Sequence, residues 1–418
     1  MKIFFHPKSR KEGSILLLTL ILAIIMGTAL GSYLVLASGQ QGSVARSQRW
    51  NAALNIAEAG IEEGLAQVNA SPSDFSVNGW TLVGTTNYGP ERQTLAHGSY
   101  SVLIAGKALP TIYSTGFVTA PITGTVMSRT IRVTTQVLPL FNVALGAVGN
   151  INMNGHNMVT DSWNSHSTNL SNNGLYTSSK ISTNGDVASE QGIVNIGQQT
   201  VNGNLYLGPT ATYVSGTNQV LGTIHNDYNV NFPEVTMPAS AATALPPVTT
   251  NGVDLLAMDN TTYIVSDNKP IEVPAGYTNV TLIVHQQNWS PTSITLDGGT
   301  TNAAFLTVYD DPSSPGGSVT IGGNSSGGGI GATPVNFIFY GTANLATLSL
   351  FGTSTFIGAI YAPDSLMKLS GGGNSYNLMG AAIVKNASIE GHYDIHYDEA
   401  LSKFGPAKGF IANSWQEL

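Results

Sequence analysis

The sequence predicts an α+β module, in which one long N-terminal helix lies on a small antiparallel sheet, followed by a mainly-β solenoid. Three observations predict this fold class. A long apolar run near the N-terminus continues into an amphipathic helical pattern. Three runs with strand-like alternation follow between residues 98 and 137. The C-terminal half repeats short apolar runs at a period near 21 residues. We therefore expect a basic leader over residues 1–13, a first module over 14–140 and a second over 141–410.

The apolar run is long enough to cross a lipid bilayer as a helix. Residues 14–37 are mostly apolar, and from Gly13 onward no charged residue occurs until Arg46. As a helix, the run spans roughly 36 Å at ~1.5 Å per residue, which exceeds a bilayer core of about 30 Å. The leader before it is basic. We therefore expect the N-terminus to stay in the cytoplasm and the rest of the chain to lie across the membrane.

The helical pattern continues beyond the apolar run. Apolar residues recur at spacings of three and four, which places them on one face of a helix. Charged residues lie between them, so the opposite face suits water. The side chains expected to pack this half against the protein are Trp50, Leu54, Ala57, Ile61 and Leu65.

A small sheet is expected to receive that helix. Residues 98–105, 111–118 and 128–137 alternate between apolar and polar side chains, as strands with one buried face do. Short turns between them indicate an antiparallel meander, and its apolar face needs a cover. Residues 70–98 contain several glycines and prolines and are interpreted as a loop-rich connection.

These N-terminal residues resemble those of type IV pilin-like proteins. The leader ends in Gly13, an uninterrupted apolar half-helix follows, and the segment NIAEAGIEEGLAQV occupies residues 55–68. The similarity is greatest to PilX-type minor pilins and pseudopilins. It implies cleavage between Gly13 and Ser14 by a prepilin peptidase, and packing of the apolar half-helix against other pilin-like subunits in a filament. Major pilins carry a glutamate at the fifth position after the cleavage point, where this chain has Leu18, which argues against a bulk filament subunit.

Two other interpretations of the N-terminus stay open. A Sec signal peptide could be cut after Ala37, because Val35 and Ala37 suit the small-residue rule, although its apolar region would be longer than the usual ~7–15 residues. A generic single-pass anchor is the other alternative.

The composition narrows the possible functions. Between residues 141 and 330 the chain has two lysines (Lys180 and Lys269), no arginine and twelve carboxylates. Nucleic acid binding depends on basic side chains at the phosphates, so we expect no nucleic acid partner. Cysteine is absent, which excludes disulfides and thiolate metal sites.

The second module contains the internal repeat. Residues 340–348 align with 361–369 at an offset of 21, and 356–363 align with 378–385 at an offset of 22. Such a period is typical of a solenoid whose rungs stack and share one core. A Pro-rich stretch near 233–250 is interpreted as a connector between two halves. A β-sandwich is the structural alternative.

This module also resembles a domain of uncharacterised function that follows PilX-type N-termini in bacterial envelope proteins. The similarity depends on segments such as FIGAIYAP (356–363) and HYDEAL (396–401). It spans roughly 145–405 and implies no known catalytic activity.

The best candidate for site chemistry is the segment 391–399. Four residues would project to one side of an extended strand and are plausible ligands of Zn²⁺ or Mn²⁺: His392, Asp394, His396 and Asp398. The simpler interpretation is a last strand that packs its intervening Tyr and Ile side chains inward. Asp310 and Asp311 are interpreted as a turn rather than as Ca²⁺ ligands. Ser162 and Ser165 beside His166 form no oriented triad.

The predicted function is that of a minor pilin- or pseudopilin-like envelope protein. We expect a single-pass inner-membrane protein whose N-terminus is cytoplasmic and whose bulk is periplasmic or extracellular. It would contribute to assembly or priming of a type IV pilus or type II secretion-like filament, or to adhesion through contacts with glycans or surfaces. No cofactor and no enzymatic activity are expected. The alternatives are a membrane-anchored carbohydrate-active β-helix enzyme and a plain Sec-exported adhesin.

Overall fold

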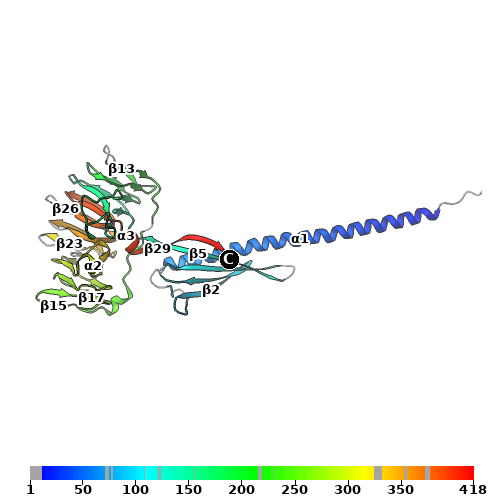
Figure 1. Ribbon diagram of the computed structural model, residues 1–418, viewed down its shortest axis with the longest axis horizontal. Helices are drawn as coiled ribbons and strands as arrows, with labels where there is room; N and C mark the ends of the chain where they lie inside the picture. Colours follow the sequence, from blue (N-terminus) through cyan, green and yellow to red (C-terminus); the bar gives the residue numbers. More distant parts are fainter. Residues whose placement is uncertain are drawn as a thin grey trace, which may run out of the picture. The chain divides into compact units, whose positions relative to one another are not determined.

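The computed structural model describes residues 12–70, 75–76, 79–107, 109–120, 124–155, 157–214, 219–230, 232–323, 332–352, 355–371 and 377–418. A long N-terminal helix is followed by a small antiparallel sheet and a large mainly-β region in which most strands pair in parallel (Figure 1). The chain forms two compact units. The first unit comprises Met1–Leu138 and Ala407–Leu418, and the second comprises Pro139–Pro406.

One continuous helix organises the first unit. The helix α1 runs from Glu12 to Ala70 without interruption. No proline lies within it, and Pro72 follows its end, where a helix would have to stop. The expected continuity between residues 37 and 50 is confirmed. Figure 1 shows the second half of α1 lying along the sheet, whereas the first half extends beyond it.

The sheet of the first unit has the order β1-β2-β3-β4-β5-β29. Its elements are β1 (Leu82–Val83), β2 (Asn87–Leu95), β3 (Gly98–Ala105), β4 (Thr111–Thr119), β5 (Val126–Pro139) and β29 (Ala407–Glu417). The strands β3, β4 and β5 pair antiparallel, which confirms the predicted meander. Their alternate side chains are buried against α1, including Val102, Ile112 and Ile131.

Three strands of this sheet, β1, β2 and β29, were not predicted. The strand β2 lies where we expected only a loop; most of its side chains are exposed, so no apolar alternation marks it, and its pairing with β3 holds it in place. The strand β29 lies at the edge beside β5, where the backbone NH of Leu418 donates to the carbonyl of Thr130 at 2.9 Å. The second unit therefore ends at Pro406 and not at residue 410 as expected.

The second unit begins with a stack of short parallel strands. Its members are β6 (Leu145–Ala147), β7 (Ile151–Met153), β8 (Val159–Trp163), β9 (Val187–Ser189), β10 (Ile193–Asn195), β11 (Thr200–Val201), β12 (Leu205–Leu207), β13 (Thr212–Val214) and β14 (Ile224–His225). The strand β6 pairs with β9, β9 with β12, and β12 with β14, all in parallel. We call residues 145–225 the first stack.

A connector then leads to a second stack. Residues 226–247 contain the short 3-10 helix η1 (Ala239–Thr243) and otherwise form neither helix nor extended strand among the described residues. The elements that follow are β15 (Val248–Thr250), β16 (Val253–Leu255), β17 (Thr261–Val265), β18 (Ile271–Val273), β19 (Val280–Val284), β20 (Asn288–Trp289), β21 (Ile294–Leu296), α2 (Gly299–Asn302), β22 (Leu306–Asp310), β23 (Gly317–Gly323), η2 (Pro334–Asn336), β24 (Phe337–Gly341), β25 (Leu345–Gly352), β26 (Phe356–Gly371), β27 (Asn377–Gly391), β28 (Asp394–Asp398) and α3 (Leu401–Phe404). We call residues 248–398 the second stack.

The two stacks meet at a seam. The last strands of the second stack pair in parallel with the first strands of the first stack: β27 with β6 and β7, and β28 with β8. Along the column of stacked strands, the second stack (248–398) therefore comes first and the first stack (145–225) follows it, in the reverse of their order in the sequence. Because both ends of the second unit lie at this seam, the backbone NH of Leu140 donates to the carbonyl of Pro406 at 3.0 Å.

One column of inward side chains runs through both stacks and across the seam. Register partners follow one another in the order Tyr263, Leu282, Val308, Phe339, Ile360, Ala382, Leu145, Val187, Leu205 and Ile224. All are buried except Ile224 in the terminal strand, which is 46% exposed. Burial of apolar surface between neighbouring strands is therefore shared along the whole unit.

The repeat in the sequence corresponds to the observed strand register. Tyr340 pairs with Tyr361 and Phe356 with Leu378, at the predicted offsets of 21 and 22. Leu348, however, pairs with Met367 and not with Leu369. A turn at residues 342–344 separates β24 from β25, whereas β26 is continuous, so the offset changes within one rung.

A carboxylic acid lies in an inward-facing column of the second stack. Asp310, fully buried at the end of β22, has Val284 and Gly341 as register neighbours. Neither of its carboxylate oxygens has a hydrogen-bond partner among the described residues. Burial, together with the nearby charge of Asp311, raises the pKa of Asp310 to about 8. Asp310 thus belongs to a strand, and only Asp311 begins the expected turn.

We predict that Asp310→Asn makes the second unit more stable than the parent chain as the pH rises. The folded state retains the proton up to about pH 8, whereas the unfolded chain loses it near its ordinary pKa of about 3.9. In the parent chain, the contribution of Asp310 to the free energy of unfolding is fully present below that ordinary pKa. It falls by up to about 1.4 kcal/mol per pH unit between that pKa and pH 8.

Chemical denaturation of parent and variant at several pH values between 4 and 9 measures this difference. The Asp227→Asn variant is the control, because Asp227 is an exposed carboxylate of the same unit, whereas the charge of Asp311 acts on Asp310 itself. A pH-independent difference between the parent and Asp310→Asn would contradict the assignment of a buried, protonated Asp310.

Candidate functional site

The first half of α1 is an apolar surface without a partner in the described structure. Large apolar side chains from Ile15 to Leu36 are 45% or more exposed around the whole helix. By length and composition, the helix can cross a membrane. Both threonine hydroxyls of this half are paired within the helix, since Thr19 donates to the carbonyl of Leu16 at 2.9 Å and Thr28 to that of Ile24 at 3.0 Å. Such internal pairing is required in lipid, where water cannot solvate polar groups.

The second half of α1 contacts the sheet through small residues. Ala53, Ala57, Gly60 and Gly64 face β3 and β4 and are buried. A methyl group on Gly60 would collide with Ser114 and come within 2.8 Å of Val102, and one on Gly64 would come within 2.6 Å of Ile112. The helix backbone therefore approaches the sheet more closely than larger side chains would allow.

The strand side of this contact is equally restricted. A methyl group on Gly116 of β4 would collide with the carbonyl oxygen of Ala53 and come within 2.6 Å of the backbone nitrogen of Ala57. Both partners there are helix backbone, which cannot rotate away as a side chain can. We call Ala53, Ala57, Gly60 and Gly64 the small-residue face.

The predicted packing residues are only partly in this contact. Ala57 and Ile61 are buried, and Leu54 and Leu65 are half-buried beside the core. Trp50 differs from the prediction: it is 48% exposed, and the guanidinium carbon of Arg129 lies 5.1 Å from its ring centroid. The face of α1 that is buried is centred on small residues. It is therefore rotated around the helix axis from the face predicted from the large apolar side chains.

Two predicted processing residues lie in the first turn of the helix. Gly13 and Ser14 belong to α1. Cleavage between them stays a prediction, as does the role of the basic leader, most of which lies outside the described residues.

An ion pair joins the C-terminal strand β29 to β5. Arg129 of β5 contacts both carboxylate oxygens of Glu417 in β29. The hydrogen bond from Arg129 lowers the pKa of the Glu417 carboxyl. At the other end of β29, the backbone NH of Phe410 donates to the side-chain oxygen of Asn69 at 2.6 Å. The last strand therefore links the end of α1 to the edge of the sheet.

The four predicted metal ligands separate into different environments. His392 Nε2 lies 3.3 Å from Asp394 Oδ2, and His396 Nδ1 lies 2.6 Å from Asp161 Oδ1. Asp398 is fully buried and accepts a bond from the backbone NH of Ser165 at 2.9 Å. The described residues contain no group of three or more His, Cys, Asp or Glu side chains placed to hold a metal ion. The residues between them, Tyr393, Ile395 and Tyr397, are buried, as the simpler interpretation required.

A buried polar cluster forms around His396 at the seam. Asp161, on the neighbouring strand β8, accepts a second bond from the hydroxyl of Tyr176 at 2.9 Å. The Tyr176 ring stacks on the His396 ring with centroids 3.8 Å apart. Burial and the carboxylate of Asp161 raise the pKa of Tyr176 far above its usual range. The sequence indicated neither Asp161 nor Tyr176, because they lie more than 200 positions before His396.

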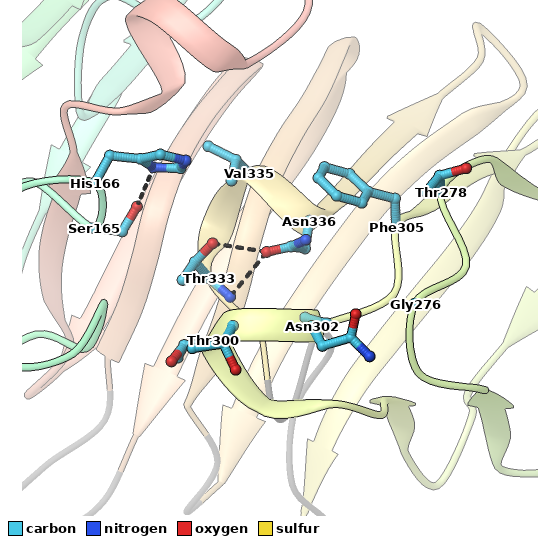
Figure 2. A pocket seen from close by; sticks show the side chains of 12 residues that line it. Ser165, His166, Gly276, Thr278, Thr300, Asn302, Phe305, Thr333, Val335 and Asn336 are labelled. Carbon is cyan, nitrogen blue, oxygen red and sulfur yellow. Dashed lines mark hydrogen bonds between the residues drawn. The ribbon is translucent and has the colours of Figure 1, made fainter.

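A separate pocket opens on one side of the second unit (Figure 2). It has a volume of about 340 Å³. Four segments supply its walls, namely the loop after β8, the loop before β19, the turn around α2 and the segment at η2. The lining residues are Ser165, His166, Gly276, Thr278, Thr300, Thr301, Asn302, Ala303, Phe305, Thr333, Val335 and Asn336.

Two internal contacts fix the pocket walls. The side-chain oxygen of Asn336 accepts bonds from Thr333, at 2.7 Å from its hydroxyl and 3.2 Å from its backbone NH. His166 stacks on Phe404 of α3 with ring centroids 4.2 Å apart, and its Nδ1 lies 3.2 Å from the Ser165 hydroxyl. Figure 2 shows His166, Val335, Asn336 and Phe305 along one rim, with Thr300 and Asn302 on the opposite side. Among the described residues no carboxylate accepts a hydrogen bond from His166, so no Ser-His-Asp arrangement is formed around Ser165.

Part of the second unit matches a known family. Residues 247–404 match the family described as "Domain of unknown function (DUF7305)". This segment begins at the second stack and ends with α3, so it covers the C-terminal part of the range 145–405 in which we expected an uncharacterised domain. No curated protein sequence matches this chain.

One solved structure gives a weak similarity. The crystal structure of the competence-associated pilin ComZ from Thermus thermophilus aligns over 88% of this chain and 97% of that chain, with 12% identity and a TM-score of 0.30. A TM-score this low does not show a shared fold.

We predict that Gly60→Ala destabilises the first unit, whereas Gly42→Ala does not. Both glycines lie in α1, and alanine favours a helix by roughly 0.8–1 kcal/mol over glycine. A methyl group at Gly42 meets nothing within 4 Å, but one at Gly60 collides with Ser114. Overpacking of this kind costs typically 1–3 kcal/mol.

Thermal unfolding of the purified full chain in detergent, followed by far-ultraviolet circular dichroism, compares the two variants. The midpoint should fall for Gly60→Ala and stay level or rise for Gly42→Ala. Equal midpoints would show that the small-residue face does not set the distance between helix and sheet.

Proposed function

We propose that this chain is a membrane-anchored, minor pilin- or pseudopilin-like envelope protein whose apolar half-helix packs among similar subunits. The observation that carries the proposal is the unbroken helix from Glu12 to Ala70. An ordinary signal anchor needs only the apolar half. A subunit of a helical filament needs that half joined rigidly to a folded module, and the small-residue face supplies the rigid joint.

The exposed apolar surface supports the same proposal. Fifteen or so large apolar side chains facing outward would be strongly unfavourable in water, at roughly 25 cal/mol per Å² of exposed apolar area. Lipid before assembly, and the apolar half-helices of other subunits after it, both remove that surface from water. In this proposal the basic leader keeps the N-terminus in the cytoplasm, and both folded units lie across the inner membrane.

We further infer that the second unit is a β-solenoid made of two stacks. The support is the series of parallel registers at separations near 20 residues and the single side-chain column across the seam. In this proposal the second unit is an insertion between β5 and β29 of a pilin-like module, and it presents a polar surface outside the membrane for adhesion or filament priming. The pocket lining contains no carboxylate, so a binding role suits it better than glycoside hydrolysis, which uses a pair of them.

Mass spectrometry of the mature N-terminus tests the proposed function. We predict a chain that begins at Ser14, because the prepilin peptidase would cut after Gly13. A Gly13→Leu variant should accumulate uncut, while Gly27→Ala, deeper in the apolar half, should be processed normally.

Two results would contradict the proposal. A mature chain beginning at Ser38 would indicate a Sec signal peptide, and the helix would then lack its apolar half. A full-length chain beginning at Met1 in the native envelope would indicate a plain anchor.

A further inference from the structure

The pocket of Figure 2 is polar without being charged. Apart from the imidazole of His166, the polar side chains of its lining carry hydroxyl or amide groups, and none is a carboxylate. No lysine or arginine is present to balance an anion. The pocket therefore suits a ligand with many hydroxyl groups and no net charge.

The side-chain amide of Asn336 in the pocket wall can donate a hydrogen bond to a ligand. The Asn336 side chain is mostly buried, and its oxygen is occupied by Thr333. Its amide nitrogen makes no hydrogen bond to any described residue, and Figure 2 shows it on the side of Phe305. This nitrogen is not one of the enclosed, unpaired side-chain atoms of the described residues, so it is open to the pocket and can donate to a ligand acceptor.

The wall beside Asn336 is largely apolar. Phe305 is 41% exposed, and the buried Val335 and Ala303 line the same pocket. Figure 2 shows Val335 between Phe305 and His166, whose ring stacks on Phe404. Flat apolar side chains facing hydroxyl and amide groups match a pyranose ring, which has a C–H face and a polar edge. A volume of about 340 Å³ lies in the range of small-ligand pockets, ~300–1,000 Å³.

From these observations the geometry assigns a binding site for a neutral saccharide, one or two sugar units of a glycan, to this pocket. Phe305 contacts the C–H face of the ring, and Asn336 and Asn302 bind its hydroxyl groups. The assignment names a ligand class for the adhesive role proposed above, but it depends only on the second unit. The fate of the N-terminal helix does not affect it.

Saturation-transfer-difference NMR on the purified full chain tests the assignment. The detergent must be zwitterionic, since a sugar headgroup would compete for the pocket. The probes are glucose, galactose, mannose and N-acetylglucosamine, with N-acetylneuraminic acid as the acidic comparison. We expect at least one neutral sugar to bind with a dissociation constant on the order of 1 mM, as a small polar ligand should. The acidic sugar should give no signal.

Matched variants locate the binding. Phe305→Ala should weaken it at least about tenfold, and Asn302→Ala by about three- to tenfold, because an apolar contact or a hydrogen bond is lost. Phe351→Ala is the control: Phe351 lies in β25, is 40% exposed and does not line the pocket. Both Phe305 and Asn302 are exposed, so their variants should fold.

Several outcomes would overturn the assignment. These are no signal from any neutral sugar, equal or stronger binding of the acidic sugar, and the same loss in Phe351→Ala as in Phe305→Ala. A mature N-terminus at Ser38 would refute the filament proposal and leave this result unchanged, so the two proposals fail separately.

Discussion

The unbroken backbone hydrogen-bond ladder of α1 is the constraint on which the first unit depends. In lipid a helix satisfies its own NH and carbonyl groups, and the threonines of the apolar half do the same with their hydroxyls. That ladder continues into water without a proline or a break. The helix backbone then packs directly against the sheet, because even a methyl group at Gly60, Gly64 or Gly116 would be too close to its neighbours. Because the helix is unbroken and packs closely on the sheet, its apolar half and the folded first unit should move as one rigid body.

The second unit depends on a different constraint, the sharing of one apolar column between strands far apart in sequence. A short strand such as Leu145–Ala147 cannot bury its own inward side chain, and it is stabilised by Ala382 on one side and Val187 on the other. The seam also brings the two ends of the unit together at Leu140 and Pro406. An insertion whose ends meet can be accommodated between two neighbouring strands, since their pairing need not be disturbed. This explains how β29 returns to β5 after a long excursion.

Features with a local period could be predicted from the sequence, and features made by distant pairing could not. The helix, the strands β3 to β5 and the offset of Tyr340 from Tyr361 all show regular spacing within a short window. The small-residue face was missed because a search for helical periodicity weighs large apolar side chains, and it selected Trp50, which is exposed. The strands β2 and β29 are mostly exposed and show no apolar alternation to mark them. The pairing of His396 with Asp161 and the pocket between His166 and Asn336 depend on the seam, which no spacing reveals.

The central claim, a rigid helix through the membrane exit, can be measured directly. The chain has no cysteine, so the double variant Leu36→Cys, Asn51→Cys carries two spin labels, one at each end of residues 37–50. Double electron–electron resonance in lipid nanodiscs should give a narrow distribution, with backbones roughly 22 Å apart for fifteen residues at ~1.5 Å each. A broad distribution, or a markedly shorter mean distance, would show a bend or an unwound segment and would contradict the account.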